Sequence, residues 1–139
     1  MSPSRRDAAT LYAAVVLGSA LGGTARWLAG DVLHDWAGAG FPWGTLFVNA
    51  TGSFLIGAYA ALAGPDGRLL ASPRQRQFVM TGICGGYTTF SIFSLETVRL
   101  FEAGRHALAG LNVAVSVVLW LGSVWAGWTL ATRMNRLRR

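Results

Sequence analysis

The stretch GICGGYTTFSIFS, residues 82–94, places three glycines, two threonines and two serines inside an otherwise apolar segment. Each glycine weakens a helix by about 1 kcal/mol relative to alanine, and the two threonines are β-branched and stiff. Within a membrane, a break in the helical backbone is tolerated only where protein, ions or water satisfy the freed groups. We therefore expect a helix that is broken here, at a place where its backbone has other partners.

Composition indicates that the segment lies in a membrane. Of the 139 residues, 53% are hydrophobic and 13% are charged, whereas roughly 25% are charged in soluble globular domains. Four stretches carry no charge, and they are residues 8–25, 41–64, 78–95 and 107–132. Each is long enough for a helix to cross a hydrocarbon core of roughly 30 Å.

The sequence thus predicts an all-α integral membrane protein with four transmembrane helices, the third of them broken mid-membrane. We expect one four-helix membrane domain over residues 1–139, with spans at 8–29, 42–64, 77–101 and 106–131. The first connection is expected around Asp31, His34, Asp35 and Pro42. A signal peptide over the first apolar run is the alternative for that segment, because Arg5 and Arg6 precede it.

The positive charge of the chain is explained by membrane topology. The net charge is +6, and all twelve basic residues are arginines, most of them just beyond the ends of apolar stretches. Basic residues concentrate on the cytoplasmic side of membrane proteins. We therefore expect no nucleic-acid partner and cytoplasmic termini. Nine arginines fall on the side of the termini, and they are Arg5, Arg6, Arg68, Arg74, Arg76, Arg133, Arg136, Arg138 and Arg139.

Polar side chains follow one face of three predicted spans. Thr45, Asn49 and Ser53 are spaced four residues apart, so they share a helix face. A single hydroxyl is most simply explained by a bond to its own or a neighbouring helix, but an asparagine amide has two donors and an acceptor. The three faces together predict a polar path through the bilayer. The polar faces of the other two spans comprise Thr88, Thr89, Ser91 and Ser94 in the third span, and Asn112, Ser116 and Ser123 in the fourth, with Trp120 nearby.

Two phenylalanines add to the polar path. Phe90 and Phe93 are three residues apart and share a face, and the edge of an aromatic ring carries positive potential. Amide and hydroxyl donors together with ring edges suit a small, strongly hydrated anion, which must be bound firmly enough to lose water and weakly enough to leave. Carbonyl groups freed by the break are typical cation ligands in membrane proteins. Composition and spacing do not identify either ion.

Three motifs, in order and spacing, resemble those of the Fluc/CrcB family of fluoride channels. They are GSALGGTARW at residues 18–27, GTLFVNATGSFLIG at residues 44–57 and GICGGYTTFSIFSLE at residues 82–96. The second matches the family pattern throughout, while Ser19, Gly23, Trp27 and Ile92 depart mildly from the other two. The resemblance covers essentially the whole chain.

The resemblance implies a passive, fluoride-selective channel in the bacterial cell membrane that exports cytoplasmic fluoride. Members of this family form antiparallel dual-topology dimers in the lipid, with two pores along the protomer interface and a structural Na⁺ at the centre. The implied Na⁺ ligands are the backbone carbonyls of Gly85 and Thr88. The implied pore residues are Asn49, Phe90, Phe93, Thr45 and Ser116, with Arg26 near a vestibule and Glu96 after the break. Asn112 and Trp120 occupy positions where the family varies.

The arginine distribution raises a question about the partner. A homodimer of opposed protomers requires each copy to insert both ways, whereas nine arginines against at most three favour one orientation. The family also includes pairs of chains with opposite orientation. We therefore hypothesise a heterodimer with a related, oppositely biased chain, with the homodimer as the alternative.

Other functional classes explain the sequence less well. A four-span proton-coupled antiporter for drugs or other cations needs a carboxylate within a span, and Glu96 is the acidic residue placed for that role, three residues before Arg99. An enzyme is not indicated, because His34 and His106 lie in predicted loops without a nucleophile at catalytic spacing. A non-transporting scaffold would explain the glycines but not the aligned polar and aromatic residues.

Overall fold

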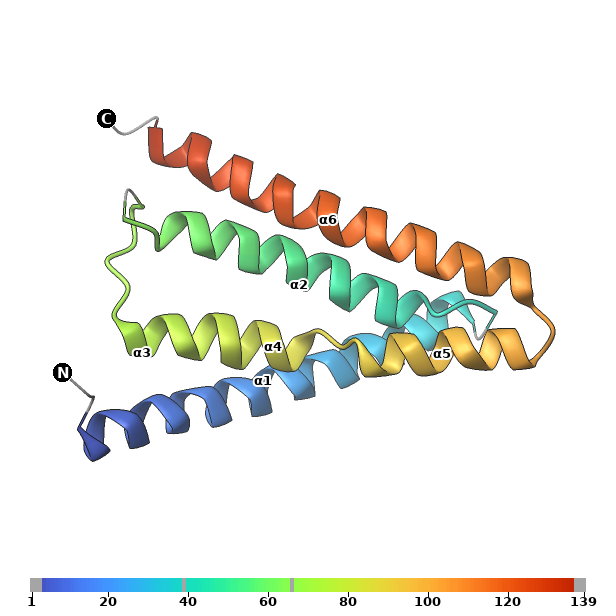
Figure 1. The fold of residues 1–139 in the computed structure, drawn as a ribbon, viewed down its shortest axis with the longest axis horizontal. Helices are drawn as coiled ribbons and strands as arrows, with labels where there is room; N and C mark the ends of the chain where they lie inside the picture. The colour runs from blue at the N-terminus through green and yellow to red at the C-terminus, as the bar shows by residue number, and fades with distance from the viewer. Residues whose placement is uncertain (1–3, 39, 66, 137–139) are drawn as a thin grey trace.

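The computed structural model describes residues 4–38, 40–65 and 67–136, and this part of the chain is helical with no β-strand. Four helical segments in it are long and apolar enough to cross a membrane, as the sequence predicted. They run side by side along one long axis (Figure 1). Their bounds are Arg5–Ala37, Trp43–Leu62, Pro73–Glu102 and His106–Arg136.

Capping residues determine where helix α1 (Arg5–Ala37) begins and ends. The Ser4 hydroxyl accepts a hydrogen bond from the Asp7 amide at 3.2 Å, and the Ser4 amide donates to the Asp7 carboxylate at 3.3 Å. This capping box satisfies two of the free groups at the helix start. The helix ends at Gly38, whose φ of 74° is a left-handed conformation that glycine adopts readily.

The sequence prediction for the first connection holds for Pro42 and was wrong for the other three residues. Asp31, His34 and Asp35 belong to the last turns of α1, because no proline or residue with positive φ lies within Arg5–Ala37. Polar side chains are tolerated in this part of the helix because most of it is exposed. His106 likewise begins helix α6 (His106–Arg136) and does not lie in a loop.

The third span is assembled from four consecutive pieces. Helix α3 (Pro73–Arg76) starts with a capping box between Ser72 and Gln75 and continues into the π-helix η1 (Gln77–Cys84) and the single turn α4 (Gly85–Tyr87). Thr88 then has extended backbone, with φ −86° and ψ 159°. Helix α5 (Ser91–Glu102) resumes the helical path. The turns with π-type hydrogen bonding thus lie one α-helical turn before the extended backbone at Thr88, and such turns occur often at functional sites.

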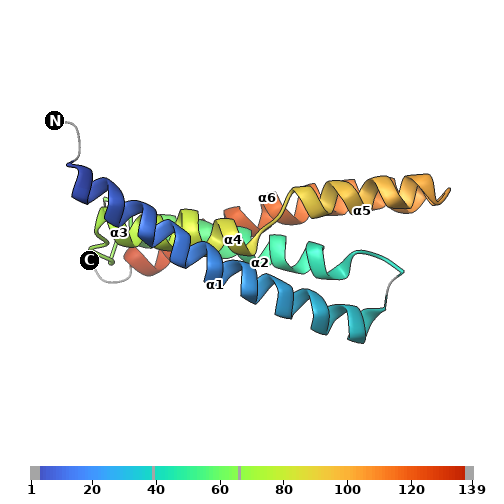
Figure 2. The same ribbon diagram turned by 90° about the horizontal axis from the view of Figure 1, so that it is seen from below.

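Glycines allow α1 to cross the third span at backbone distance. A Cβ placed on Gly82 would lie 2.8 Å from the Cα of Gly18, and one placed on Gly86 would lie 2.8 Å from the Cα of Ser19. Gly18 and Gly22 of α1 lie at the same crossing, since a Cβ on Gly18 would lie 2.8 Å from the Gly82 Cα and one on Gly22 would lie 2.8 Å from the Tyr87 amide nitrogen. Figure 2 shows α1 crossing diagonally in front of the third span between the labels α3 and α4 and separating from α5, and the described residues of α1 and α5 are not in contact.

Helix α2 (Trp43–Leu62) packs along α6 through a second pair of glycines. A Cβ on Gly57 would overlap the Val124 carbonyl, and one on Gly127 would lie 3.0 Å from the Ala58 amide nitrogen. Small residues at such crossings are how helices associate in lipid, where apolar burial supplies little driving force. The two glycine crossings therefore fix α1 on the third span and α6 on α2.

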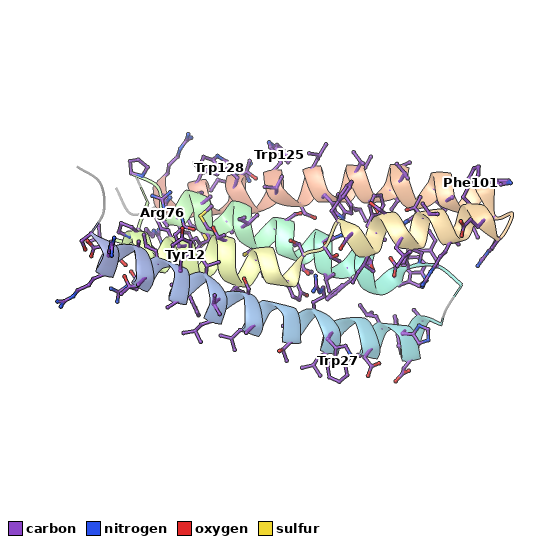
Figure 3. All side chains as sticks on the ribbon, turned by 60° about the horizontal axis from the view of Figure 1, so that its bottom comes forward. Tyr12, Trp27, Arg76, Phe101, Trp125 and Trp128 are labelled. Atoms are coloured by element: carbon purple, nitrogen blue, oxygen red, sulfur yellow. The ribbon has the colours of Figure 1, made fainter. Side chains whose placement is uncertain are left out.

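The outer surface of the bundle is apolar. Trp27 projects outward from α1, and Trp125 and Trp128 project outward from α6 (Figure 3). Helix α1 begins and α6 ends at one end of the bundle, beside the connection between α2 and α3 (Figure 1). At the other end the Arg105 guanidinium donates to the Gly40 carbonyl at 2.7 Å and joins the two remaining connections.

Candidate functional site

The centre of the site is a pair of hydrogen bonds between α2 and the interruption in the third span. The Asn49 side-chain nitrogen donates to the Thr89 carbonyl at 2.8 Å, and the Thr89 amide donates to the Asn49 side-chain oxygen at 2.7 Å. Both residues are buried. One asparagine side chain thus satisfies both backbone groups of a residue that lies outside any helix.

The interruption releases two backbone carbonyls. In a continuous helix the amides of Thr89 and Ile92 would bond the carbonyls of Gly85 and Thr88, four residues earlier. Here the Thr89 amide bonds Asn49, and the Ile92 amide bonds the Thr89 hydroxyl at 3.2 Å. The side chains of Asn49 and Thr89 therefore divert the donors that would otherwise occupy Gly85 and Thr88.

Arg26 reaches the same backbone from α1. Its Nη1 donates to the Thr88 carbonyl at 3.1 Å. The Thr88 amide and hydroxyl both turn back to the Cys84 carbonyl, at 3.0 and 2.9 Å. A carbonyl oxygen has two lone pairs, so Arg26 leaves Thr88 able to accept one further partner.

Two cavities meet at the interruption. The first, which we call the Arg26 cavity, has a volume of about 410 Å³ and lies between α1, α2 and the start of α5. The second, the Phe90 cavity, has a volume of about 410 Å³ and lies between α2, α6 and the end of η1. Thr89 lines both of them, so the Asn49–Thr89 pair is part of the wall that separates them.

The Arg26 cavity is polar and charged. Arg26, Thr45 and Glu96 line it, with Asp31 and His34 toward the connection that follows α1. One oxygen of Glu96, Oε2, is enclosed and has no hydrogen-bond partner in the described part of the chain. This cavity therefore presents the Arg26 guanidinium, the hydroxyls of Thr45 and Thr89, and the carboxylates of Asp31 and Glu96.

The Phe90 cavity contains no charged side chain in its lining. Its polar lining consists of Asn49, Ser53, Thr88, Thr89 and Trp120, and Gly85 and Phe90 complete the open side. Phe90 is 71% exposed, so the cavity opens on the surface of the single chain. The predicted face of Thr45, Asn49 and Ser53 therefore spans both cavities.

The two phenylalanines have different surroundings. The Phe90 and Phe93 ring centroids are 5.5 Å apart and the rings are inclined by 50°. Phe93 is only 7% exposed, and its ring meets Trp120 of α6 in a T-shaped contact with centroids 4.9 Å apart. Phe90 is thus the ring that an ion at the surface of the chain would meet, and Phe93 supports it from within.

Ser116 belongs to a buried network that ties α6 to α5. Its hydroxyl donates to Asn112 at 3.5 Å, Asn112 donates to the Thr97 hydroxyl at 2.8 Å, and Thr97 donates to the Phe93 carbonyl at 2.8 Å. Asn112 and Ser116 are each 1% exposed. Neither these two residues nor Phe93 line the two cavities.

The model of the CrcB-like proteins, described as camphor resistance (CrcB), matches residues 13–128. The chain belongs to the CrcB-like family. The matched range includes both cavities and the whole of the interruption.

Curated relatives in this family are similar over nearly their full length. "Fluoride-specific ion channel FluC 1" of Rhodopseudomonas palustris is 63% identical over 134 residues, which cover 96% of this chain and 94% of the relative. "Fluoride-specific ion channel FluC 1" of Bradyrhizobium diazoefficiens is 59% identical over 138 residues, which cover 99% of this chain and 96% of the relative. "Fluoride-specific ion channel FluC" of Methylocella silvestris is 47% identical, over 91% of this chain and 97% of the relative.

The sequence of this CrcB-like chain places Thr89 on the polar face of the third span but does not show its contacts. The motif contained it, but only the folded backbone shows that it bonds Asn49 and faces both cavities. The family resemblance implies no role for Trp120, whereas in the structure its side chain lines the Phe90 cavity. Its helical spacing from Ser116 was the available signal, because residues four apart share a face.

Proposed function

We propose that this chain is a subunit of a passive, fluoride-selective channel that exports fluoride from the cytoplasm. Membership of the CrcB-like family and the names of the curated relatives support fluoride as the ion. The observation that carries the proposal is the Asn49–Thr89 pair between two polar cavities, one of which carries Arg26 and the other Phe90.

The proposed path leads through the two cavities and past Asn49. Arg26 presents a cation to an entering anion beside the carboxylates of Asp31 and Glu96, and the Thr45 hydroxyl offers a donor in the same cavity. The Asn49 amide has two N–H groups, of which one is bonded to Thr89, so the second is available to a passing anion. Beyond it the ring edge of Phe90 replaces part of the hydration shell.

Phe93 and Ser116 support the proposed pore lining from behind without lining either cavity. Phe93 contacts the Phe90 ring, and Ser116 anchors the buried network that ends on the Phe93 carbonyl. We propose that they hold the ring edges in the orientation that an anion requires. No covalent step is involved, and a membrane potential of 100 mV supplies about 2.3 kcal/mol per ion for export.

A second protomer is part of the proposal. The Phe90 cavity opens on the surface of the chain, and an antiparallel partner in the lipid would enclose it and form a second, equivalent pore. The interruption at Thr88 lies near the middle of the segment Pro73–Glu102. We therefore place the break in the third span at mid-membrane, in a bacterial cell membrane.

A structural Na⁺ fits the residues present. The diversion of the Thr89 and Ile92 amides leaves the carbonyls of Gly85 and Thr88 without their helical donors. The outward side of Gly85 is open, since a Cβ placed there would meet no atom closer than 3.9 Å. Two carbonyls are too few for a cation, so a partner protomer would contribute the others. Na⁺ would supply positive charge that holds the two interrupted helices together.

The orientation of the chain follows from its arginines. Seven of the nine arginines counted above are described, and they lie near the end of the bundle where α1 begins and α6 ends. We propose that this end is cytoplasmic and that the partner is a related chain of opposite orientation. Full fluoride efflux from liposomes that contain this chain alone would contradict a requirement for a second chain.

The function is tested by flux measurements on reconstituted liposomes, with the related chain added where this chain alone is inactive. A fluoride electrode should record efflux when valinomycin lets K⁺ leave the liposomes down its gradient together with the anion. A chloride electrode should record no efflux under the same conditions. Phe90→Ala should reduce the fluoride signal, whereas Trp125→Phe, on the outer face of α6, should not. Absence of fluoride efflux, or equal efflux of chloride, would refute the proposed function.

A further inference from the structure

Trp120 of α6 has an indole N–H without a partner. Its Nε1 is enclosed and makes no hydrogen bond with the described residues, while its side chain lines the Phe90 cavity together with Asn49 and Thr88. The indole nitrogen can only donate, and a buried tryptophan usually satisfies it. Inside a membrane no bulk water compensates for a missing acceptor.

The neighbouring polar groups of α6 do not share this situation. Asn112 and Ser116 lie on the same helix face, are buried, and are hydrogen-bonded in the network that reaches Thr97. The T-shaped contact with Phe93 holds one side of the Trp120 ring. The unpaired N–H is therefore a specific property of Trp120 at the wall of the cavity.

The cavity has acceptors of its own, but none of them bonds the indole: the carbonyls released by the interruption belong to Gly85 and Thr88, which line it together with Ser53. Its lining contains no aspartate, glutamate, lysine or arginine. The Asn49 side-chain oxygen already accepts from the Thr89 amide, and the Thr88 hydroxyl is directed to Cys84. A small anion in the cavity has the chemistry of the acceptor that the indole lacks in the structure.

We propose that the Trp120 indole N–H is a hydrogen-bond donor to the anion in the Phe90 cavity. Because Nε1 is covered in the structure, the donor reaches the ion by a rotation of the indole toward the cavity. Trp120 would then add a second donor opposite the free N–H of Asn49. The identity of the anion as fluoride rests on the proposed function.

The first test removes the N–H and keeps an aromatic ring. Trp120→Phe should lower fluoride efflux from liposomes by about tenfold, the loss expected for one hydrogen bond to a charged group. The matched control is Trp125→Phe on the same helix, which is 70% exposed and lines neither cavity. If Trp120→Phe folds poorly, substitution by benzothienylalanine, which replaces the N–H by sulfur at nearly constant shape, takes its place.

The second test observes the donor directly. In ¹⁵N-tryptophan-labelled channel in detergent, the indole signal that Trp120→Phe removes should shift on addition of sodium fluoride and not of sodium chloride. The chain has six tryptophans, so the other five serve as internal controls. Wild-type efflux in the N–H-free variant, or an indole signal that ignores fluoride in an active channel, would overturn the role of Trp120. A wild-type channel that passes no fluoride would instead refute the proposed function.

Discussion

The side-chain amide of Asn49 holds both backbone groups of Thr89, at 2.8 and 2.7 Å, across the interface between α2 and the interrupted third span. The pair closes the gap that extended backbone leaves in the span and releases the Gly85 carbonyl at the same time. Asn49, which lies on the polar face assigned to the ion path, therefore also stabilises the interruption of the third span.

Replacing Asn49 should affect both stability and transport. Asn49→Ala leaves the buried amide and carbonyl of Thr89 unpaired, which costs about 1–3 kcal/mol for each group. We expect a lower melting temperature in detergent and loss of fluoride efflux. Ser53→Ala, one turn along the same face and in the same cavity, is the control. An Asn49→Ala channel as stable as the wild type would show that the two bonds contribute little.

Thr89 should control the response to sodium. Thr89→Val keeps the shape of the side chain but removes the hydroxyl that accepts from the Ile92 amide, so this amide can return to the Thr88 carbonyl. We expect the stabilisation of the assembled channel by Na⁺ over N-methylglucamine to decrease, as measured by thermal unfolding. Thr89→Ser retains the hydroxyl and should keep the sodium effect. Equal sodium dependence in the two variants would contradict this reading of the break.

The two phenylalanines should separate transport from stability. Phe93→Ala empties a buried site beside Trp120, and removal of a buried phenylalanine costs about 3–5 kcal/mol. Phe90→Ala removes an exposed ring, so it should reduce fluoride efflux with little change in the unfolding of the single chain. Efflux and melting temperature measured on both variants test this. A Phe90→Ala channel with wild-type flux would remove Phe90 from the path.

Arg26 should act through its charge and its hydrogen bond. Arg26→Gln removes the cation from the cavity and weakens the contact with the Thr88 carbonyl, so we expect fluoride efflux to fall several-fold, most strongly at low ionic strength. Arg26→Lys retains the charge and should recover part of the flux. The measurement is efflux rate against salt concentration. A loss that is independent of salt would indicate a purely structural role.

Neighbouring glycines in α1 should respond in opposite ways. A Cβ on Gly22 would meet the Tyr87 amide at 2.8 Å and overlap the Ile83 carbonyl, whereas Gly23 has no atom within 4 Å of such a Cβ. Overpacking of this kind costs about 1–3 kcal/mol, so Gly22→Ala should lower the melting temperature. Gly23→Ala should be neutral or slightly stabilising because alanine favours the helix. Equal melting temperatures of the Gly22→Ala and Gly23→Ala variants would contradict the close crossing of α1 and the third span.

The sequence by itself was sufficient for the membrane class and for the four spanning segments, because a span is recognised by length and lack of charge. It also predicted a break at residues 82–94, since glycines and β-branched threonines weaken a helix wherever they cluster, and Thr88 in that stretch has extended backbone. The motifs around residues 44–57 and 82–96 led to the family. Hydroxyl and amide spacing predicted one polar face for Thr45, Asn49 and Ser53, and these residues line the two cavities.

Only the tertiary structure decided which groups meet across that face. Helical periodicity gives the angle of a residue about its own helix, but not the crossing of helices, which the glycine contacts of Gly18 and Gly57 set. That crossing brings Asn49 to the Thr89 backbone, places Thr89 between two cavities and encloses Ser116 in a network. Hydrogen bonds between segments 40 residues apart depend on that geometry, and no local pattern encodes it.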